Sequence, residues 1–192
     1  EFDFDGIRRG LSDPSVKVVF IQRSRGYEWR DALSQKQIAA ACAFVRECGF
    51  EGCIFVDNCY GEFVEETEPT QNGADIAVGS LIKNPGGGIA PTCGYIVGKR
   101  AFVERIACRL TAPSIGAEVG SYMYGYQSFY QGVFLAPHVV CQAVKGSLLI
   151  GACLAKLGYK TSPSLGVDPY DITRAICFAM NEPLISFIQA VQ

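Results

Sequence analysis

The segment that decides the fold, residues 53–83, reads CIFVDNCYGEFVEETEPTQNGADIAVGSLIK. It contains two short apolar runs, at 53–56 and 74–78, and each run is followed at once by polar or small residues. Runs of this length and composition predict strands that are buried on both faces. Asp57 ends the first run and Lys83 follows the second, so both charged residues are expected beyond strand ends.

The same pattern continues on both sides of this segment. Apolar runs at 16–21 and 95–97 predict further strands, and the apolar spacing within 35–48 predicts a helix. The remaining predicted elements are helices at 4–11, from about 101, at 137–157 and at 183–191, and a strand at 172–178. Strands that alternate with helices favour an α/β fold with a mostly parallel sheet, in which ligands bind beyond the strand ends.

The composition indicates a globular chain. Of its 192 residues, 49% are hydrophobic, and 17 basic against 19 acidic residues give a formal net charge of -2. Because no block of basic residues occurs, we expect no nucleic acid and no anionic membrane surface as a partner. The most apolar stretch, 139–155, is interrupted by Gln142 and Lys145, and we interpret it as a buried helix rather than a membrane span.

The nine cysteines and the single histidine do not indicate a metal site. No two cysteines have the C-x-x-C spacing of zinc sites, and one histidine leaves few nitrogen ligands. We therefore predict no metal, and we interpret the cysteines as reduced residues of a cytoplasmic protein. His138 is interpreted as a capping or packing residue, and Cys59 and Cys93 as structural thiols.

Asp57 and Lys83 together predict a particular cofactor chemistry. A lysine at a strand end is suited to a Schiff base, because desolvation and nearby cationic groups lower the pKa of its amine. Pyridoxal 5′-phosphate (PLP) supplies the carbonyl, and an acidic residue opposite its pyridine nitrogen strengthens the ring as an electron sink. We therefore predict that Lys83 holds PLP, that Asp57 contacts the pyridine nitrogen and that the Ser80 hydroxyl binds the phosphate.

Three segments carry a resemblance to a known family: IQRSRGY at 21–27, FVDNCYGEF at 55–63 and GSLIKNPGGG at 79–88. They look like the methionine gamma-lyase family, whose members are also called aluminium resistance proteins. The resemblance extends over essentially the whole chain. It implies the large domain of a PLP enzyme of fold type I, similar to aspartate aminotransferase, and a homodimer or homotetramer.

The resemblance also implies roles for individual residues. Lys83 would be the catalytic lysine, and the cofactor would be bound by Lys83, Asp57, Ser80, Tyr60, Ser24 and Arg25. One departure is Cys93, where the resemblance leads us to expect glycine. If that glycine allows a close approach of the backbone, local packing or activity is altered here.

We expect the chain to be a fragment of a longer protein. It begins without methionine, and the family's amino-terminal phosphate loop and carboxy-terminal substrate-binding arginine have no counterpart in it. Residues 1–160 are predicted to be a PLP-binding large domain without its N-terminal part. Residues 161–192 are predicted to begin a smaller C-terminal domain, with a linker at 161–169.

The predicted function is that of a PLP-dependent carbon–sulfur lyase that eliminates a thiol from a sulfur-containing amino acid. Only the resemblance favours sulfur substrates, because the residues themselves serve many PLP reactions. A β-lyase, aldolase or transaminase and a non-catalytic fragment stay open as alternatives. A nucleotide-binding module without PLP is disfavoured, because no phosphate-binding glycine motif is present.

Overall fold

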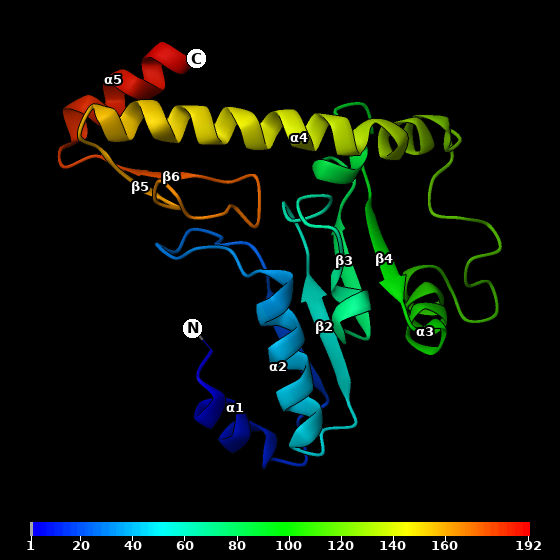
Figure 1. The fold of residues 1–192 in the computed structure, drawn as a ribbon. Helices are drawn as coiled ribbons and strands as arrows, with labels where there is room; N and C mark the ends of the chain where they lie inside the picture. The colour runs from blue at the N-terminus through cyan, green and yellow to red at the C-terminus, as the bar shows by residue number, and fades with distance from the viewer. Residues whose placement is uncertain (1) are drawn as a thin grey trace.

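In the computed structural model, which describes residues 2–192, the centre of the molecule is a four-stranded sheet (Figure 1). Its strands lie in the order β1 (Val18–Gln22), β2 (Cys53–Asp57), β3 (Ile76–Ser80) and β4 (Gly94–Gly98). β1, β2 and β3 run parallel, and β4 is antiparallel to β3. The predicted α/β fold with a mostly parallel sheet is therefore confirmed.

The helix α2 (Gln35–Glu47) packs on the sheet and closes the core. It begins after Ser34, whose hydroxyl accepts a hydrogen bond from the Gln37 backbone N–H, while the Gln37 side chain accepts one from the Ser34 N–H. This capping box satisfies N–H groups that the first turn of a helix leaves free. The core that results includes the fully buried Ile38, Val45, Ile54 and Val56.

The other elements of this half of the molecule are short. α1 (Phe4–Leu11) packs against α2, and α3 (Arg100–Leu110) follows β4 directly. Two 3-10 helices lie in the connections, η1 (Pro69–Asn72) before β3 and η2 (Asn84–Gly86) after it. The predicted helices at 4–11, at 35–48 and from about 101 are confirmed.

The helix α4 (Gln127–Lys156) differs from its prediction in two ways. Pro137 lies inside the helix, so the predicted start at Pro137 is wrong. The helix crosses the whole width of the molecule in Figure 1 and leaves many large apolar side chains exposed, among them Phe134 and Leu149. The interpretation as a buried helix is therefore wrong within the described chain, where few residues pack on this surface.

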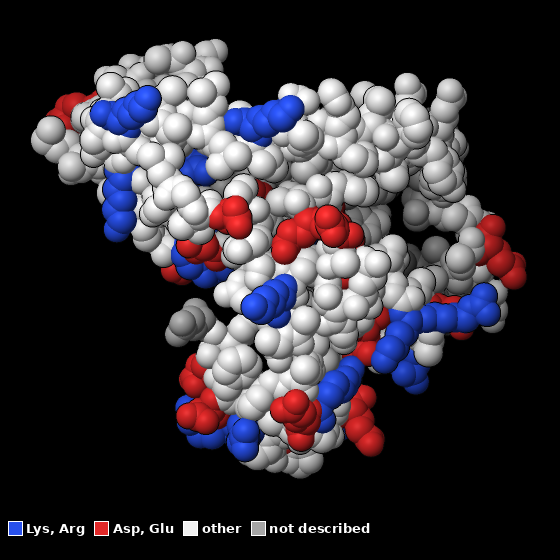
Figure 2. Space-filling view, viewed as in Figure 1, with Lys and Arg blue, Asp and Glu red and all other residues white. Residues whose placement is uncertain are grey.

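The surface over α4 is poor in charge. Figure 2 shows a mostly white band there with a few blue side chains, whereas red and blue side chains gather below it. By length and composition, α4 is long and apolar enough to cross a membrane. Buried core helices of other proteins pass the same test, so this finding is weak support for a membrane span.

The C-terminal segment forms a small hairpin and a helix. β5 (Lys160–Ser162) pairs with β6 (Ala175–Cys177) in the antiparallel direction, and α5 (Asn181–Val191) follows. The predicted linker is wrong at its start, because Thr161 and Ser162 belong to β5 and are buried. The predicted strand at 172–178 is shorter than expected, and the predicted helix at 183–191 is confirmed. The division at residue 160 stays a prediction.

Candidate functional site

The parallel pairing of β2 and β3 brings the predicted site residues to one edge of the sheet. Asp57 is the last residue of β2 and pairs in register with Val78 of β3. β3 ends at Ser80, and the chain then turns, with the Lys83 N–H donating to the Ser80 carbonyl at 3.2 Å. The carboxyl ends of parallel strands are where ligands bind in α/β sheets.

Asp57, Cys59, Tyr60 and Lys83 form one group of side chains, which we name the Lys83 cluster. The Asp57 carboxylate accepts a hydrogen bond from the Cys59 N–H at 3.0 Å. The Lys83 Nζ atom lies 4.3 Å from the centroid of the Tyr60 ring, a cation–π distance. Both Asp57 and Lys83 act on the Cys59 thiol, whose pKa is raised by burial and by Asp57 and lowered by Lys83. The Cys59 thiol therefore lies close enough to both charged residues to interact with each of them.

The direction of the Lys83 pKa differs from the prediction. Partial burial pulls this pKa down, but Cys59 and Tyr60 outweigh burial, so the pKa of Lys83 is raised. The prediction was wrong because it assumed cationic neighbours, and the side chains that the fold places beside Lys83 are a thiol and a phenol. In this structure the amine is therefore stabilised in its protonated form.

Ser80 lies at the same edge of the sheet as Asp57 and comes shortly before Lys83 in the chain. It ends β3, is half-buried and pairs with Gly94 of β4. Its carbonyl receives the hydrogen bond from Lys83, which makes the turn between them compact. The role of its hydroxyl as a phosphate ligand stays a prediction.

The segment 23–25 after β1 is buried and engaged in contacts with the protein. Arg23, fully buried, donates to Asn58 Oδ1 at 2.8 Å and to the Gly61 carbonyl at 2.9 Å. It also forms an ion pair of 2.7 Å with Glu65. Arg23 therefore braces the loop that carries Cys59 and Tyr60.

Ser24 and Arg25 point to the C-terminal segment. The Ser24 hydroxyl donates to Asp171 Oδ2 at 2.8 Å, and Arg25 donates to the Ser162 carbonyl at 2.6 Å. Burial lowers the pKa of Arg25, and Asp171 and Asp31 oppose this effect. Cofactor binding by Ser24 and Arg25 thus stays a prediction, since both side chains already have partners within the chain.

Several residues near the Lys83 cluster were missed by the sequence analysis. The Ile172 N–H donates to the Tyr60 carbonyl at 3.1 Å, next to the buried Asp171. Asn84 donates to the carbonyls of Tyr60 and Glu62. Asn84 and Glu62 stand inside the quoted motifs, which was a usable signal, whereas nothing in the sequence around Asp171 connects it with β1.

Glu62 is a buried acid in the same loop. It is 3% exposed and accepts a hydrogen bond from the Tyr95 hydroxyl at 2.9 Å. Its second oxygen, Oε2, has no hydrogen-bond partner among the described residues. Burial raises the pKa of Glu62 to about 7.

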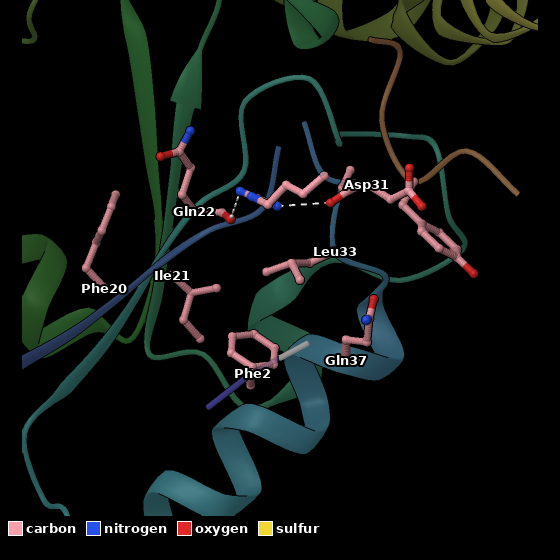
Figure 3. A pocket seen from close by; sticks show the side chains of 10 residues that line it. Phe2, Phe20, Ile21, Gln22, Asp31, Leu33 and Gln37 are labelled. Atoms are coloured by element: carbon pink, nitrogen blue, oxygen red, sulfur yellow. Dashed lines mark hydrogen bonds between the residues drawn. The ribbon is translucent and has the colours of Figure 1, made fainter. Parts of the chain in front are cut away.

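A hollow of the described surface lies beside β1 and outside the Lys83 cluster. Figure 3 shows Phe20, Ile21 and Gln22 of β1 on one side and Leu33 and Gln37 on the other. The volume is about 540 Å³. Arg30 also lines it and donates to the Gln22 carbonyl at 3.1 Å. None of the four residues of the Lys83 cluster lines this hollow, so it does not define the site.

Comparison with known proteins identifies related chains. A sequence model described as methionine gamma-lyase matches residues 1–192. The uncharacterized protein YnbB of Bacillus subtilis is 45% identical over 192 residues, which are 100% of this chain and 45% of YnbB.

Solved structures agree with this result. A Clostridium acetobutylicum protein, provisionally assigned as a cystathionine beta-lyase involved in aluminum resistance, is 45% identical with a TM-score of 0.94, covering 98% of this chain and 45% of that one. A carbon-sulfur lyase involved in aluminum resistance from Clostridium novyi NT is 42% identical with a TM-score of 0.91, covering 96% and 44%. The chain spans less than half the length of these relatives.

A more distant likeness concerns the fold alone. The pyridoxal-5′-phosphate-dependent protein YhfS from Escherichia coli is 16% identical with a TM-score of 0.62, and the match covers 92% of this chain and 46% of that one.

Proposed function

This chain belongs to the methionine gamma-lyase family, and from that premise we propose that it is the lysine-bearing part of a PLP-dependent carbon–sulfur lyase. The observation that carries the proposal is the Lys83 cluster at the carboxyl ends of β2 and β3. The names of the relatives from both Clostridium species support carbon–sulfur cleavage. A sulfur-containing amino acid is therefore the proposed substrate, and the cytoplasm is the proposed location.

The residues of the cluster fit the chemistry of PLP. Lys83 offers an amine for covalent attachment, Asp57 a carboxylate for the pyridine nitrogen, and Tyr60 a hydroxyl group for the ring. Ser80, which ends β3 outside the cluster, offers a hydroxyl group for the phosphate oxygens. When bound, PLP supplies the electron sink that stabilises negative charge on the α-carbon of an amino acid. Lys83 Nζ is the group that would accept the α-proton, and for this the amine must lose the proton that its present neighbours favour.

The bracing of the loop explains how the chain would hold this arrangement without distortion. Arg23 ties the loop to β1 through Asn58 and Gly61, and the Cys59 N–H orients the Asp57 carboxylate. Catalytic groups need support of this kind, because displacement of a group by about 1 Å can cost a hundredfold in rate.

The proposal includes a homo-oligomer. The apolar surface of α4 supports it, because contiguous exposed apolar surface commonly marks a contact with another chain or with another part of the same protein. The rest of a native-length protein could cover the same surface. Sedimentation of the native-length protein would distinguish the two cases, and a monomer would contradict the oligomer.

The test of the function compares the native-length protein with its Lys83→Ala variant, each purified with added PLP. We expect the parent to show the visible-to-near-ultraviolet absorbance band of a lysine-bound cofactor, and borohydride to fix the cofactor to Lys83. The variant should lack this band. Lys36→Ala, which removes an exposed lysine of α2, is the matched control and should keep the band.

A second measurement addresses the reaction. The parent is incubated with cystathionine, methionine and cysteine, and the keto acid and the released sulfur product are quantified; that product is a thiol from the first two and hydrogen sulfide from cysteine. Thiol release that needs Lys83 supports the lyase. A well-folded parent without the absorbance band would exclude the PLP proposal and leave a non-catalytic role, while a band without thiol release would point to another PLP reaction.

A further inference from the structure

We propose that Asn84 is a positioning residue that holds the ring of Tyr60 against Lys83. The inference deepens the proposed function, on which it rests for the importance of Lys83 as the reacting amine. Asn84 follows Lys83 directly, begins η2 and is 4% exposed. It thus stands between the lysine and the loop that faces it.

A single amide group of Asn84 connects the two segments. Its Nδ2 atom donates to the Tyr60 carbonyl and to the Glu62 carbonyl, both at 3.0 Å. Both N–H groups of the amide therefore donate hydrogen bonds to the backbone of the same short segment, residues 60–62. Because both partners are acceptors, they determine which way the amide faces, and Oδ1 is left without a hydrogen-bond partner among residues 2–192.

The backbone of Tyr60 needs this support. Tyr60 has a φ of 71°, in the left-handed region that side chains other than glycine rarely adopt. A residue in this region persists when surrounding contacts hold it there. The Tyr60 carbonyl receives hydrogen bonds from Asn84 and from the Ile172 N–H, at 3.0 and 3.1 Å, and these contacts hold the conformation.

The conformation of Tyr60 decides where its ring lies. In this conformation the ring is 4.3 Å from Lys83 Nζ, and Tyr60 contributes to the raised pKa of the lysine. Loss of the Asn84 amide would leave the Ile172 N–H as the remaining donor to the Tyr60 carbonyl, and the ring would spend less time against Lys83. Lys83 would then lose a partner of its protonated form, and more of its amine would be neutral at a given pH.

The chemistry of the position explains why the residue is an amide. Two carbonyl oxygens face the side chain of Asn84, so the side chain must supply two donors. Aspartate has the same shape, but when ionised it has only acceptors and would repel both carbonyls. Because a carboxylate beside Lys83 would itself favour the protonated amine, Asn84→Leu is the better variant of similar size: it removes both donors and adds no charge.

The experiment measures how fast Lys83 reacts with an acylating reagent in the native-length protein freed of cofactor. The modified peptide is quantified by mass spectrometry, and all variants are compared at the same pH, which lies below the pKa of the lysine. A cation–π contact of about 0.5 to 1 kcal/mol predicts that Asn84→Ala speeds the reaction about two- to fivefold. Tyr60→Leu, which removes the ring, should give a similar increase. The double variant should react no faster than the faster single variant.

If the effects of the two single variants do not add in the double variant, Asn84 acts through Tyr60 and not by loosening the fold in general. Asn72→Ala is the matched control, because Asn72 also donates to a backbone carbonyl, that of Glu68, but lies outside the Lys83 cluster. It should leave the Lys83 rate unchanged. If Asn84→Ala fails to fold, Asn84→Leu, which has a similar size and adds no charge beside Lys83, gives the decision.

An unchanged Lys83 rate in a folded Asn84 variant would overturn the proposal, as would increases that multiply in the double variant. The failure of the proposed function is seen separately, as the absence of a cofactor band in the parent protein. The reactivity of Lys83 without cofactor decides the role of Asn84 in either case.

Discussion

The sheet region, which comprises β1 to β4 and α2, differs from α4 in where its apolar side chains lie. Ile38 and Ile54 of the sheet region are 0% exposed, whereas Phe134 and Leu149 of α4 are 83% and 66% exposed. Both elements are rich in apolar residues, so composition alone does not separate them. The sheet region buries its core between its own strands and helix, whereas α4 leaves its large apolar side chains exposed among the described residues.

The first prediction tests this contrast and has the largest expected effect. Ile54→Ala opens a cavity among fully buried neighbours and should lower the free energy of unfolding by about 2 to 5 kcal/mol. Leu149→Ala in α4 is the matched control and should cost less than about 0.5 kcal/mol, because the side chain is exposed. Urea unfolding of the 192-residue chain measures both, and equal losses would contradict the contrast.

The same pair of variants in the native-length protein would sharpen the comparison. A large cost of Leu149→Ala there, with a small cost in the 192-residue chain, would show that α4 is covered by residues that this chain lacks or by a partner copy. A small cost in both would mean that the α4 surface stays open.

The second prediction concerns the pH dependence of the sheet region. Glu62 releases its proton near pH 4.5 in the unfolded chain, whereas burial raises the folded pKa to about 7. Between these values the folded state holds more protons, so stability falls as the pH rises from about 4.5 to 7. Glu62→Gln keeps an acceptor for the Tyr95 hydroxyl and removes the charge.

We expect Glu62→Gln to gain on the order of 2 kcal/mol over the parent near pH 8 and little near pH 4. Hydrogen exchange resolved by segment would show the gain in β3 and β4 and not in the C-terminal part of α4. A gain in stability of the same size at both pH values would mean that the pKa of the Glu62 carboxyl is not raised in the folded state.

The third prediction has the smallest effect and concerns Cys93. Its φ of 73° lies in the left-handed region, which explains why the resemblance leads to glycine at this position. The Cys93 carbonyl accepts a hydrogen bond from the Leu81 N–H at 2.9 Å, so the strained residue lies beside the turn that leads to Lys83. Cys93→Gly should raise the free energy of unfolding by about 1 kcal/mol.

Thermal unfolding of the parent and the variant measures this gain. Hydrogen exchange should slow in the turn at residues 81–83 and remain unchanged in α4. A destabilised Cys93→Gly variant would show that contacts of the Cys93 side chain outweigh the backbone strain.

The proximity of Asp57 and Lys83 could be predicted because it depends on local patterns. Each follows a short apolar run, and parallel neighbouring strands end at the same edge of a sheet. The chemical state of Lys83 could not be predicted in the same way. It depends on Cys59 and Tyr60, which the fold places beside the lysine.

The partners of Ser24 and Arg25 show a second limit. Asp171 and Ser162 lie far along the chain, and the fold of the C-terminal segment places them beside the residues that follow β1. The exposure of α4 could not be predicted either, since an apolar helix has the same sequence pattern whether its partner is in the same chain or in another.

The sequence by itself determined the alternation of strands and helices, the family and the lysine and carboxylate beyond two strand ends, because these depend on patterns within short segments. Only the tertiary structure decided that Asn84 braces Tyr60, that Glu62 is a buried acid and that α4 is exposed. These depend on contacts between segments distant in the chain, and such contacts set burial, hydrogen bonding and charge in ways that local patterns do not record.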